Sequence, residues 1–512
     1  MLINRPNNNS IKARFSISII TNILRSCLSF ITGMIIARNL GPENYGDYSF
    51  LIGSFIAIRQ IIELGTSTAF FTFISQKKRS HNFHLYYIIW QLFQFLVVLL
   101  LITVLFPDQL IAIIWKGHDR SLIAIAFISS FLINHAWHTV VSIGESLRKT
   151  IIIQLSNLFI AVFHLVFIYI AISVYSISVR NLLVLIIVEY LFAIIITPYF
   201  LRNNEISENQ KPDSKLNEII KEYFVYCSPL VIFSVFSFIY EFSDRWLLQN
   251  YGGSVQQGYY AIAYKFTIIS LIATTSMVKV FWKEIAEAYK QKNNKKIKRL
   301  YQKSTRILFF ISCVISCFLI PWSKNIVNIF LGSDYKYAWL PLSIMFCYPL
   351  HQSLGQITSV LFMAIEKTKE YVLISNIFLI LSIPITYFMV APSSAIIPGL
   401  GMGATGIAIK MVALQFININ IQIFWLAKYF KWKFDWAYQL INISSLLILS
   451  YISKIICNTG INILNVGTNI YLIIFLTGII YFILVLSFLY YFPGLAGTSR
   501  KEMSQLFRII WK

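Results

Sequence analysis

The stretch NLGPENYGDYSFLIGSFIAIRQIIELG, from Asn39 to Gly65, places two opposite charges inside an apolar run. It opens with Gly, Pro and Asn, which are typical of a turn, and continues with residues typical of a buried helix. Arg59 and Glu63 lie four residues apart in the apolar part, so their side chains can meet on one helix face. The pair either locks helices together or lines a polar passage.

The composition of the whole chain indicates a membrane protein. Of its 512 residues, 57% are hydrophobic and 12% are charged, and the mean hydropathy is +0.69. A soluble domain carries about 25% charged residues. Because a core of this size could not hide so much apolar surface from water, the surplus must face lipid. We therefore expect a polytopic membrane protein.

Fourteen segments are long and apolar enough to cross a bilayer, which takes about 20 residues in a helix. They are residues 15–37, 48–74, 86–106, 121–143, 151–173, 181–201, 223–248, 257–281, 307–330, 339–364, 372–390, 403–427, 439–457 and 469–491. The first apolar stretch is too long for a signal-peptide core, so we expect it to be an uncleaved span. The sequence therefore predicts an all-α membrane protein with about 14 transmembrane helices.

The distribution of Lys and Arg predicts the orientation of these spans. If the N-terminus is cytoplasmic, the inner segments hold 30 of the 43 Lys and Arg residues and the outer loops hold six. Cytoplasmic loops of membrane proteins are enriched in these residues. We therefore expect both termini in the cytoplasm. The same pattern accounts for the net charge of +22 without a nucleic-acid partner.

The longest inner loop, KEIAEAYKQKNNKKIKRLYQKSTR from Lys283 to Arg306, is strongly basic. It is typical of a surface helix that lies against anionic lipid headgroups. A topology signal alone explains the same charges equally well. The outer loops are all short, so we expect no soluble domain on either side of the membrane.

The sequence lacks the motifs of soluble enzymes. It contains no Walker loop, HExxH motif or GxSxG motif. Its six cysteines lie in apolar segments without the spacing of zinc ligands, and we interpret them as reduced core residues. We therefore expect a protein that is not an enzyme, with no catalytic residue, no metal and no organic cofactor.

Two similar turns suggest an internal repeat. NLGPENYGDYSFL joins the first two expected spans, and NYGGSVQQGYYAIAYKF joins the seventh and eighth. Each is followed by a cation inside the next span, Arg59 in one case and Lys265 in the other. Two repeats of six spans each, plus an added pair, give fourteen. In transporters built from such repeats, the substrate site lies at the interface between the repeats. We expect two six-helix halves, residues 1–201 and 223–427, a cytoplasmic linker 202–222, and a C-terminal region 428–512.

Several charges fall inside expected spans, where each costs roughly 3 kcal/mol to insert. The cations are Arg25, Arg59, Arg245, Lys265 and Lys410, and the acids are Glu63, Glu189, Glu241 and Asp244. Glu241 and Arg245 repeat the spacing of the first pair, which favours a helix-locking ion pair. Arg25 and Lys265 have no equally close acid in their own segments. An anionic substrate can supply that charge, and the planar guanidinium of arginine suits phosphate.

These charges divide into two candidate sets. We expect Arg25, Arg59, Lys265 and Lys410 to form a cationic, substrate-binding lumen. Glu63, Glu189, Glu241, Asp244 and Arg245 either pair within that lumen or couple transport to H⁺ or Na⁺. His135, His138 and His164 are polar helix contacts or, alternatively, a proton relay or sugar contacts.

Three stretches resemble the Wzx-type flippases of O-antigen and related polysaccharide repeat units. They are ARNLGPENYGDYSF (37–50), IIELG (61–65) and YEFSDRWLLQNYGGSVQQGYYAIAYKF (240–266). Those flippases belong to the multidrug/oligosaccharidyl-lipid/polysaccharide (MOP) exporter superfamily. The resemblance implies two pseudo-symmetric helical lobes around a central cavity and transport by alternating access. It also implies that Arg25 and Arg59 match functional arginines of the related lipid II flippases, whereas Lys265 replaces an arginine.

The resemblance further implies a substrate, a location and partners. The substrate would be a sugar repeat unit on undecaprenyl pyrophosphate, moved from the cytoplasmic to the periplasmic leaflet of a bacterial inner membrane. Partners would be membrane lipids and the polymerase and chain-length regulator of the same lipopolysaccharide pathway. A cation-coupled multidrug extruder is the main alternative, although it predicts a lumen rich in acids and aromatics. A membrane polysaccharide polymerase is the third, although it needs a large outer loop.

Overall fold

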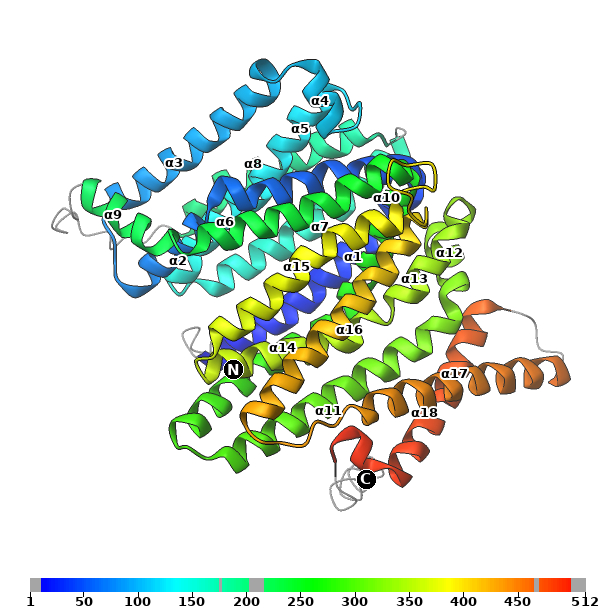
Figure 1. The fold of residues 1–512 in the computed structure, drawn as a ribbon. Helices are drawn as coiled ribbons and strands as arrows, with labels where there is room; N and C mark the ends of the chain where they lie inside the picture. Colours follow the sequence, from blue (N-terminus) through cyan, green and yellow to red (C-terminus); the bar gives the residue numbers. More distant parts are fainter. Residues whose placement is uncertain (1–10, 175–176, 202–215, 465–468, 499–512) are drawn as a thin grey trace, which may run out of the picture. The chain divides into compact units, whose positions relative to one another are not determined.

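The computed structural model describes residues 11–174, 177–201, 216–464 and 469–498 (Figure 1). Within these ranges the chain forms α-helices with short 3₁₀ and π-helical turns, and no strand. The predicted all-α membrane fold is confirmed. Most of the expected linker, residues 202–215, and both ends of the chain lie outside the described residues.

The helices fall into two compact units by their packing. One unit ends at Gly258 and includes Thr386–Gly403, and the other holds Tyr259–Ile385 and the chain from Ala404 onward. This grouping by packing does not test the boundaries 1–201, 202–222, 223–427 and 428–512, which stay a prediction.

The first unit contains nine helices and two π-helical turns before the long helix α10, counted over its described residues. They are α1 (Ile11–Glu63), α2 (Thr66–Gln76), α3 (His81–Leu100), η1 (Leu101–Leu105), α4 (Asp108–Ile114), α5 (Arg120–Phe131), η2 (Leu132–Ala136), α6 (Trp137–Ser146), α7 (Thr150–Val174), α8 (Val179–Leu201) and α9 (Leu216–Cys227). Helix α10 (Leu230–Lys290) runs from this unit into the second. Helix α1 packs against α5, α7 and α8, and its core residues include Phe50, Leu51 and Phe55.

The second unit continues from α10. It holds α11 (Asn294–Leu319), η3 (Ile320–Trp322), α12 (Ser323–Leu331), η4 (Ser333–Ala338), α13 (Trp339–Met345), α14 (Tyr348–Ala364), α15 (Thr368–Val390), α16 (Gly403–Tyr429), α17 (Ala437–Leu464), α18 (Ile470–Tyr491) and η5 (Pro493–Ala496). Helix α11 packs against α14 and α17, and α17 packs against α18. The last five residues of α15 belong to the first unit.

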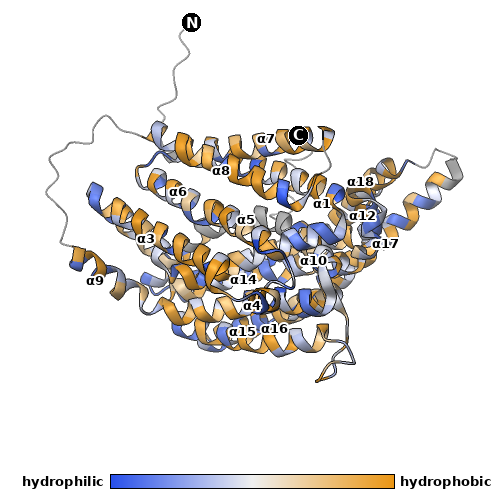
Figure 2. Ribbon diagram, turned by 90° about the horizontal axis from the view of Figure 1, so that it is seen from above, coloured by the Kyte–Doolittle hydropathy of each residue, from blue (hydrophilic) through white to orange (hydrophobic). Residues whose placement is uncertain are grey.

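The helices present apolar surface outward, as lipid contact requires. Figure 2 shows apolar residues along α7 and α8. Ile195 and Tyr199 of α8 are 72% and 76% exposed, and Phe224 of α9 is 73% exposed. Exposed surface of this kind would be costly in water but not in hydrocarbon. The protein is therefore a multi-pass membrane protein.

All fourteen expected spans fall on described helical residues, although the helices are joined differently. Ten helices in the described ranges are long and apolar enough to cross a membrane, or eleven if α9 and the first part of α10, which bend by 59°, form one span. That number is lower than fourteen because α1 and α10 each hold two expected spans. In addition, α14 has only 17 residues and needs α13 to reach spanning length.

Each of the two long helices is kinked at one glycine. Gly41 in α1 has φ 73° and ψ 170°, and Gly253 in α10 has φ 72° and ψ −179°. This backbone region is essentially open to glycine alone. The two turns that suggested an internal repeat therefore share one backbone conformation.

The two kinks also pack against each other within the first unit. Gly46 lies so close to α10 that an added Cβ would be 1.8 Å from the Ser254 carbonyl oxygen. Gly258 lies against the Pro42 carbonyl oxygen, where the corresponding distance would be 2.2 Å. Each glycine stands five residues after its own kink and touches the residue that follows the other kink. The contact is thus reciprocal, as a pseudo-two-fold repeat predicts.

Polar contacts surround this crossing. The Ser254 hydroxyl donates to Asp47 of α1, and the Gln249 side-chain amide donates to the Ser254 hydroxyl at 2.9 Å. His118, in the loop between α4 and α5, has its Nε2 atom 3.4 Å from Asp47. Burial lowers the pKa of His118, and the charge of Asp47 partly offsets this effect. Burial at the crossing therefore favours the neutral form of this imidazole.

Candidate functional site

A break between α1 and α2 positions the central charges of the first unit. Leu64 and Gly65 adopt left-handed conformations, with φ 45° and 84°, so α1 ends at Glu63 and α2 begins at Thr66. The break lies inside the expected span 48–74. It frees backbone carbonyl groups, and the buried Gln94 of α3 donates to one of them, that of Ile62, at 2.6 Å. Discontinuous membrane helices of this kind are where transporters bind charged ligands.

The predicted contact between Arg59 and Glu63 is present at this break. Arg59 Nε donates to Glu63 Oε1 at 2.8 Å, and the Ser67 hydroxyl of α2 donates to Glu63 Oε2 at 2.7 Å. Glu63 is the last residue of α1, where a negative charge is unfavourable to the helix dipole. The hydrogen bonds from Arg59 and from Ser67 of α2 offset this unfavourable interaction with the helix dipole.

Arg59 keeps most of its hydrogen-bonding capacity. Among the residues that the structure describes, only its Nε is bonded, so both terminal nitrogens of the guanidinium have no partner. The side chain is 23% exposed and that of Glu63 is 11% exposed. The pair is therefore not fully enclosed by the protein. Its free fork is the part of arginine that matches a phosphate group.

His135 approaches the same carboxylate from another helix. It lies in the π-helical turn η2, with Nε2 at 3.6 Å from Glu63 Oε1, and its ring stacks on Phe131. The residue is 3% exposed, and neither ring nitrogen has a hydrogen bond in the described part of the chain. π-Helical turns inside α-helices occur frequently at functional sites. A buried imidazole with no hydrogen-bond partner, next to a carboxylate, can exchange a proton with it.

Polar side chains of α3 and α6 extend this site. The Gln91 amide donates to the Thr139 hydroxyl at 2.8 Å and lies 3.3 Å from the Tyr87 hydroxyl. Both Gln91 and Thr139 are buried. We call Arg59, Glu63, Ser67, Gln91, His135 and Thr139 the break cluster.

A second polar contact of this unit joins α7 and α8. His164 Nδ1 lies 2.8 Å from Glu189 Oε2, while the buried Glu189 Oε1 has no hydrogen bond among the described residues. Arg25, on the first arm of α1, is half-buried and makes no hydrogen bond or ion pair within the described ranges. The role of Arg25 in substrate binding stays a prediction.

The expected ion pair between Glu241 and Arg245 is not formed. Neither side chain has a salt bridge or hydrogen bond to a described residue. The Arg245 guanidinium instead lies over Gly53 of α1, where an added Cβ would meet it at 1.8 Å. Asp244 is buried and accepts a hydrogen bond from Thr386 at 2.6 Å. Helical spacing alone thus does not bring the two charges of such a pair into contact.

The other two expected cations belong to the second unit. Lys265 of α10 is half-buried and forms no hydrogen bond or ion pair with a described residue. Lys410 of α16 is 1% exposed, and its Nζ donates to the Ser382 hydroxyl at 2.9 Å. Lys410 is therefore enclosed in the unit rather than open to a passage in this structure.

Sequence reasoning missed three of the six residues of the break cluster. Ser67, Gln91 and Thr139 are neutral, and the search for buried charges does not find neutral residues. The run YYIIWQLFQFLVVLL did hold a signal, because two glutamines three residues apart, Gln91 and Gln94, stand alone in an apolar segment. Within the described ranges, no three His, Cys, Asp or Glu side chains gather as metal ligands would.

Comparison with known proteins places the chain in a family. A family model described as polysaccharide biosynthesis protein matches residues 11–282, just over half of the chain. The chain belongs to the polysaccharide biosynthesis protein family. A second model, described as MatE, matches residues 229–388. The first match is consistent with the resemblance to Wzx-type flippases, and the two matches together support a membrane transporter of the MOP superfamily. A search of curated protein sequences found no match.

Solved structures show the same fold. The lipid II flippase MurJ in an inward closed conformation is 17% identical, with a TM-score of 0.66, and the match covers 93% of this chain and 98% of that one. An inward-facing multidrug resistance transporter of the MATE family is 16% identical, with a TM-score of 0.60, and the match covers 80% and 95%. These two matches concern a flippase and a transporter rather than enzymes. The MOP fold predicted from the sequence is therefore confirmed.

Proposed function

We propose that this family member flips an oligosaccharide linked to undecaprenyl pyrophosphate, such as an O-antigen repeat unit, across a bacterial inner membrane. The main observation in support is Arg59, whose two terminal guanidinium nitrogens have no partner among the described residues and which lies beside a helix break in the first unit. A diphosphate that crosses hydrocarbon must exchange its water for fixed positive charge. Arginine supplies two parallel hydrogen bonds to phosphate, which lysine cannot.

The second unit offers a surface suited to the lipid part of such a substrate. An almost entirely apolar cavity of about 370 Å³ is lined by side chains of α10, α12 and α18, among them Phe266, Ile326 and Ile474. A polyprenyl chain is apolar and flexible, so it can lie in such a groove. This supports a lipid-linked substrate over a water-soluble one.

Alternating access and cytoplasmic termini complete the proposal. The charge pattern supports this orientation, since Lys and Arg concentrate on the side where the N-terminus lies. We also propose that Glu63 and His135 exchange a proton during the cycle. Their atoms lie 3.6 Å apart, so a protonated His135 could replace Arg59 as the ion-pair partner of the Glu63 carboxylate. Glu189 and Asp244 stay candidates for H⁺ or Na⁺ coupling, and the polymerase and chain-length regulator stay candidate partners.

The Arg59→Gln substitution tests the proposal in cells that lack the native gene. We expect surface glycan to fall at least about tenfold, because a charge-assisted hydrogen bond contributes roughly 1.5–3 kcal/mol. The undecaprenyl-linked unit should accumulate on the inner leaflet. Arg180→Gln is the matched control, since Arg180 stands in the first turn of α8, away from the break cluster, and pairs with Asp119 at 3.1 Å. Normal glycan in the Arg59 variant, at an equal amount of inserted protein, would refute the site.

A multidrug extruder is the second candidate, favoured by the match of the MatE model to residues 229–388. It predicts that deleting the gene sensitises cells to cationic drugs and leaves surface glycan intact. A flippase predicts the reverse, so the same deletion strain separates the two functions.

A further inference from the structure

The first part of α11 carries a stripe of cations on one face. The cations are Lys295, Lys298, Arg299, Lys303 and Arg306, which recur at helical spacing, and Gln302 lies among them. All six residues line one cavity of about 530 Å³. The opposite face, with Ile297, Tyr301 and Leu308, is buried in the second unit. The stripe is therefore held in place by the packing of the helix.

The opposite wall of the cavity is the turn that follows α18. Gly494, Gly497 and Thr498 line it, and Arg306 donates to the Gly494 carbonyl at 2.8 Å. Gly497 has φ 70°, and an added Cβ would lie 2.9 Å from Arg306 Cβ. A glycine with this conformation lets the turn approach α11 closely. The cavity is thus lined by α11 on one side and by the turn after α18 on the other.

Three cations of the stripe have no compensating acid among the described residues. Arg306 forms an ion pair with Asp435, but Lys295, Lys298 and Arg299 make no ion pair with a described residue. Like charges at these intervals repel each other. The first turn of α11 has no acidic residue, so its cations also oppose the helix dipole. An anion bound in the cavity would relieve both effects.

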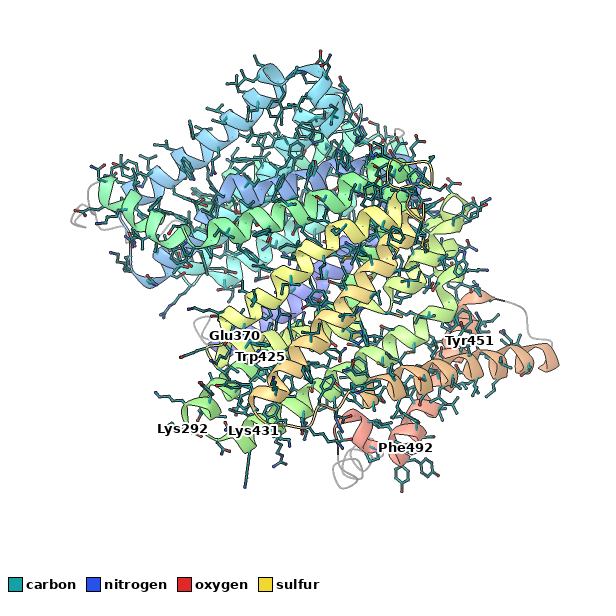
Figure 3. All side chains as sticks on the ribbon, viewed as in Figure 1. Lys292, Glu370, Trp425, Lys431, Tyr451 and Phe492 are labelled. Carbon is teal, nitrogen blue, oxygen red and sulfur yellow. The ribbon has the colours of Figure 1, made fainter. Side chains whose placement is uncertain are left out.

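The level of the cavity in the membrane indicates which anion. Tyr490, Tyr491 and Phe492 directly precede the turn and are 58%, 68% and 56% exposed. Exposed aromatic residues at a helix end mark the membrane–water interface, where lipid headgroups lie. In Figure 3, Phe492 lies at the lower edge of the second unit, as do Lys292 and Lys431. The cavity therefore opens among headgroups and not in hydrocarbon.

We propose that this cavity binds the phosphate of an anionic phospholipid headgroup. The phosphodiester would lie between Lys295, Lys298 and Arg299 of α11, with Gln302 as a further donor, while the acyl chains stay in the bilayer beside α18. This site is distinct from the break cluster and does not depend on the proposed substrate. It gives the basic loop a specific ligand in addition to its role in topology.

The test measures lipid binding to the delipidated, full-length protein by native mass spectrometry. Phosphatidylglycerol and phosphatidylcholine are titrated separately, and inorganic phosphate is the free-anion arm. We expect a tight phosphatidylglycerol site that phosphatidylcholine does not fill. The triple variant Lys295→Gln, Lys298→Gln, Arg299→Gln should weaken it by about 100-fold, since each cation near a lipid surface contributes roughly fivefold.

Two further variants make the result specific. The control Lys290→Gln, Lys369→Gln, Lys428→Gln removes the same charge from exposed positions outside the cavity, and it should leave the affinity unchanged. Gln302→Glu keeps all the cations and adds a carboxylate to the wall, so it should weaken binding as well. Equal loss in the triple variant and its control would show a general charge effect and overturn the proposal. Inorganic phosphate that displaces the lipid at an equal concentration would overturn the headgroup assignment.

Discussion

At the scale of single residues, the account depends on how Arg59 divides its hydrogen bonds. One nitrogen is used for Glu63 and two are free among the described residues, so the residue both holds the helix break and keeps a fork for a ligand. A fully paired arginine in a sealed interior would serve only the first purpose. The Arg59 side chain is 23% exposed, so it is not enclosed by the protein and its free nitrogens can reach a ligand.

A double-mutant cycle on Arg59→Gln and Glu63→Gln measures this coupling. The single Glu63→Gln variant leaves a partly buried cation without its acid, so it should lower the free energy of unfolding. We expect a coupling energy of about 1–3 kcal/mol, between the values for exposed and buried pairs. Thermal unfolding of the four purified proteins in one detergent gives the result. A coupling below about 0.5 kcal/mol would show that the contact does not hold the break.

The sequence could predict the Arg59–Glu63 contact but not the rest of the break cluster. Helical spacing alone puts the two side chains on one face, so their contact is a local property. The approach of His135 depends on a π-helical turn and on how α6 packs, and neither follows from the local sequence. Lys410 shows the same limit, because its charge was evident but its enclosure beside Ser382 was not.

At the scale of elements, the two glycine kinks are the feature that recurs in the chain. Gly41 and Gly253 share one conformation, and the glycines five residues later share one type of contact. The similar turns were visible in the sequence, whereas their reciprocal contact required the structure. The following cations are not equivalent, because Lys265 lies 12 residues after its kink and Arg59 lies 18 after its own. Lys265 corresponds by position to Gly53.

Substitution of the packing glycines tests this crossing. Gly46→Ala and Gly258→Ala each place a methyl group against a backbone carbonyl that cannot move aside. Each should destabilise the protein by about 1–3 kcal/mol, the usual cost of overpacking. Gly460→Ala in α17 is the control, since nothing lies within 4 Å of its added Cβ. It should be neutral or stabilise by up to about 1 kcal/mol. Equal unfolding temperatures for all three variants would contradict the described contact.

At the scale of the whole molecule, the membrane fold and the positions of its spans could be predicted mainly from hydropathy and from the distribution of charge. Membrane insertion depends on summed apolarity and on the side of Lys and Arg, and both are properties of sequence windows. The expected spans accordingly fall on described helices. The meeting of two helices at a single non-helical glycine, Gly41 in α1 and Gly253 in α10, was not predicted, because the sequence favoured a longer turn between the two spans. The MOP fold is supported by the family and by the solved structures.

The most direct test of the central claim is transport by the purified protein. Proteoliposomes would carry a labelled undecaprenyl diphosphate glycan, and an enzyme outside the vesicles would report which molecules reach the outer leaflet. The account predicts rapid movement with the native protein, about tenfold slower movement with Arg59→Gln, and native behaviour with Arg180→Gln. Equal rates for the native and Arg59→Gln proteins would contradict a role of this arginine in carrying the diphosphate.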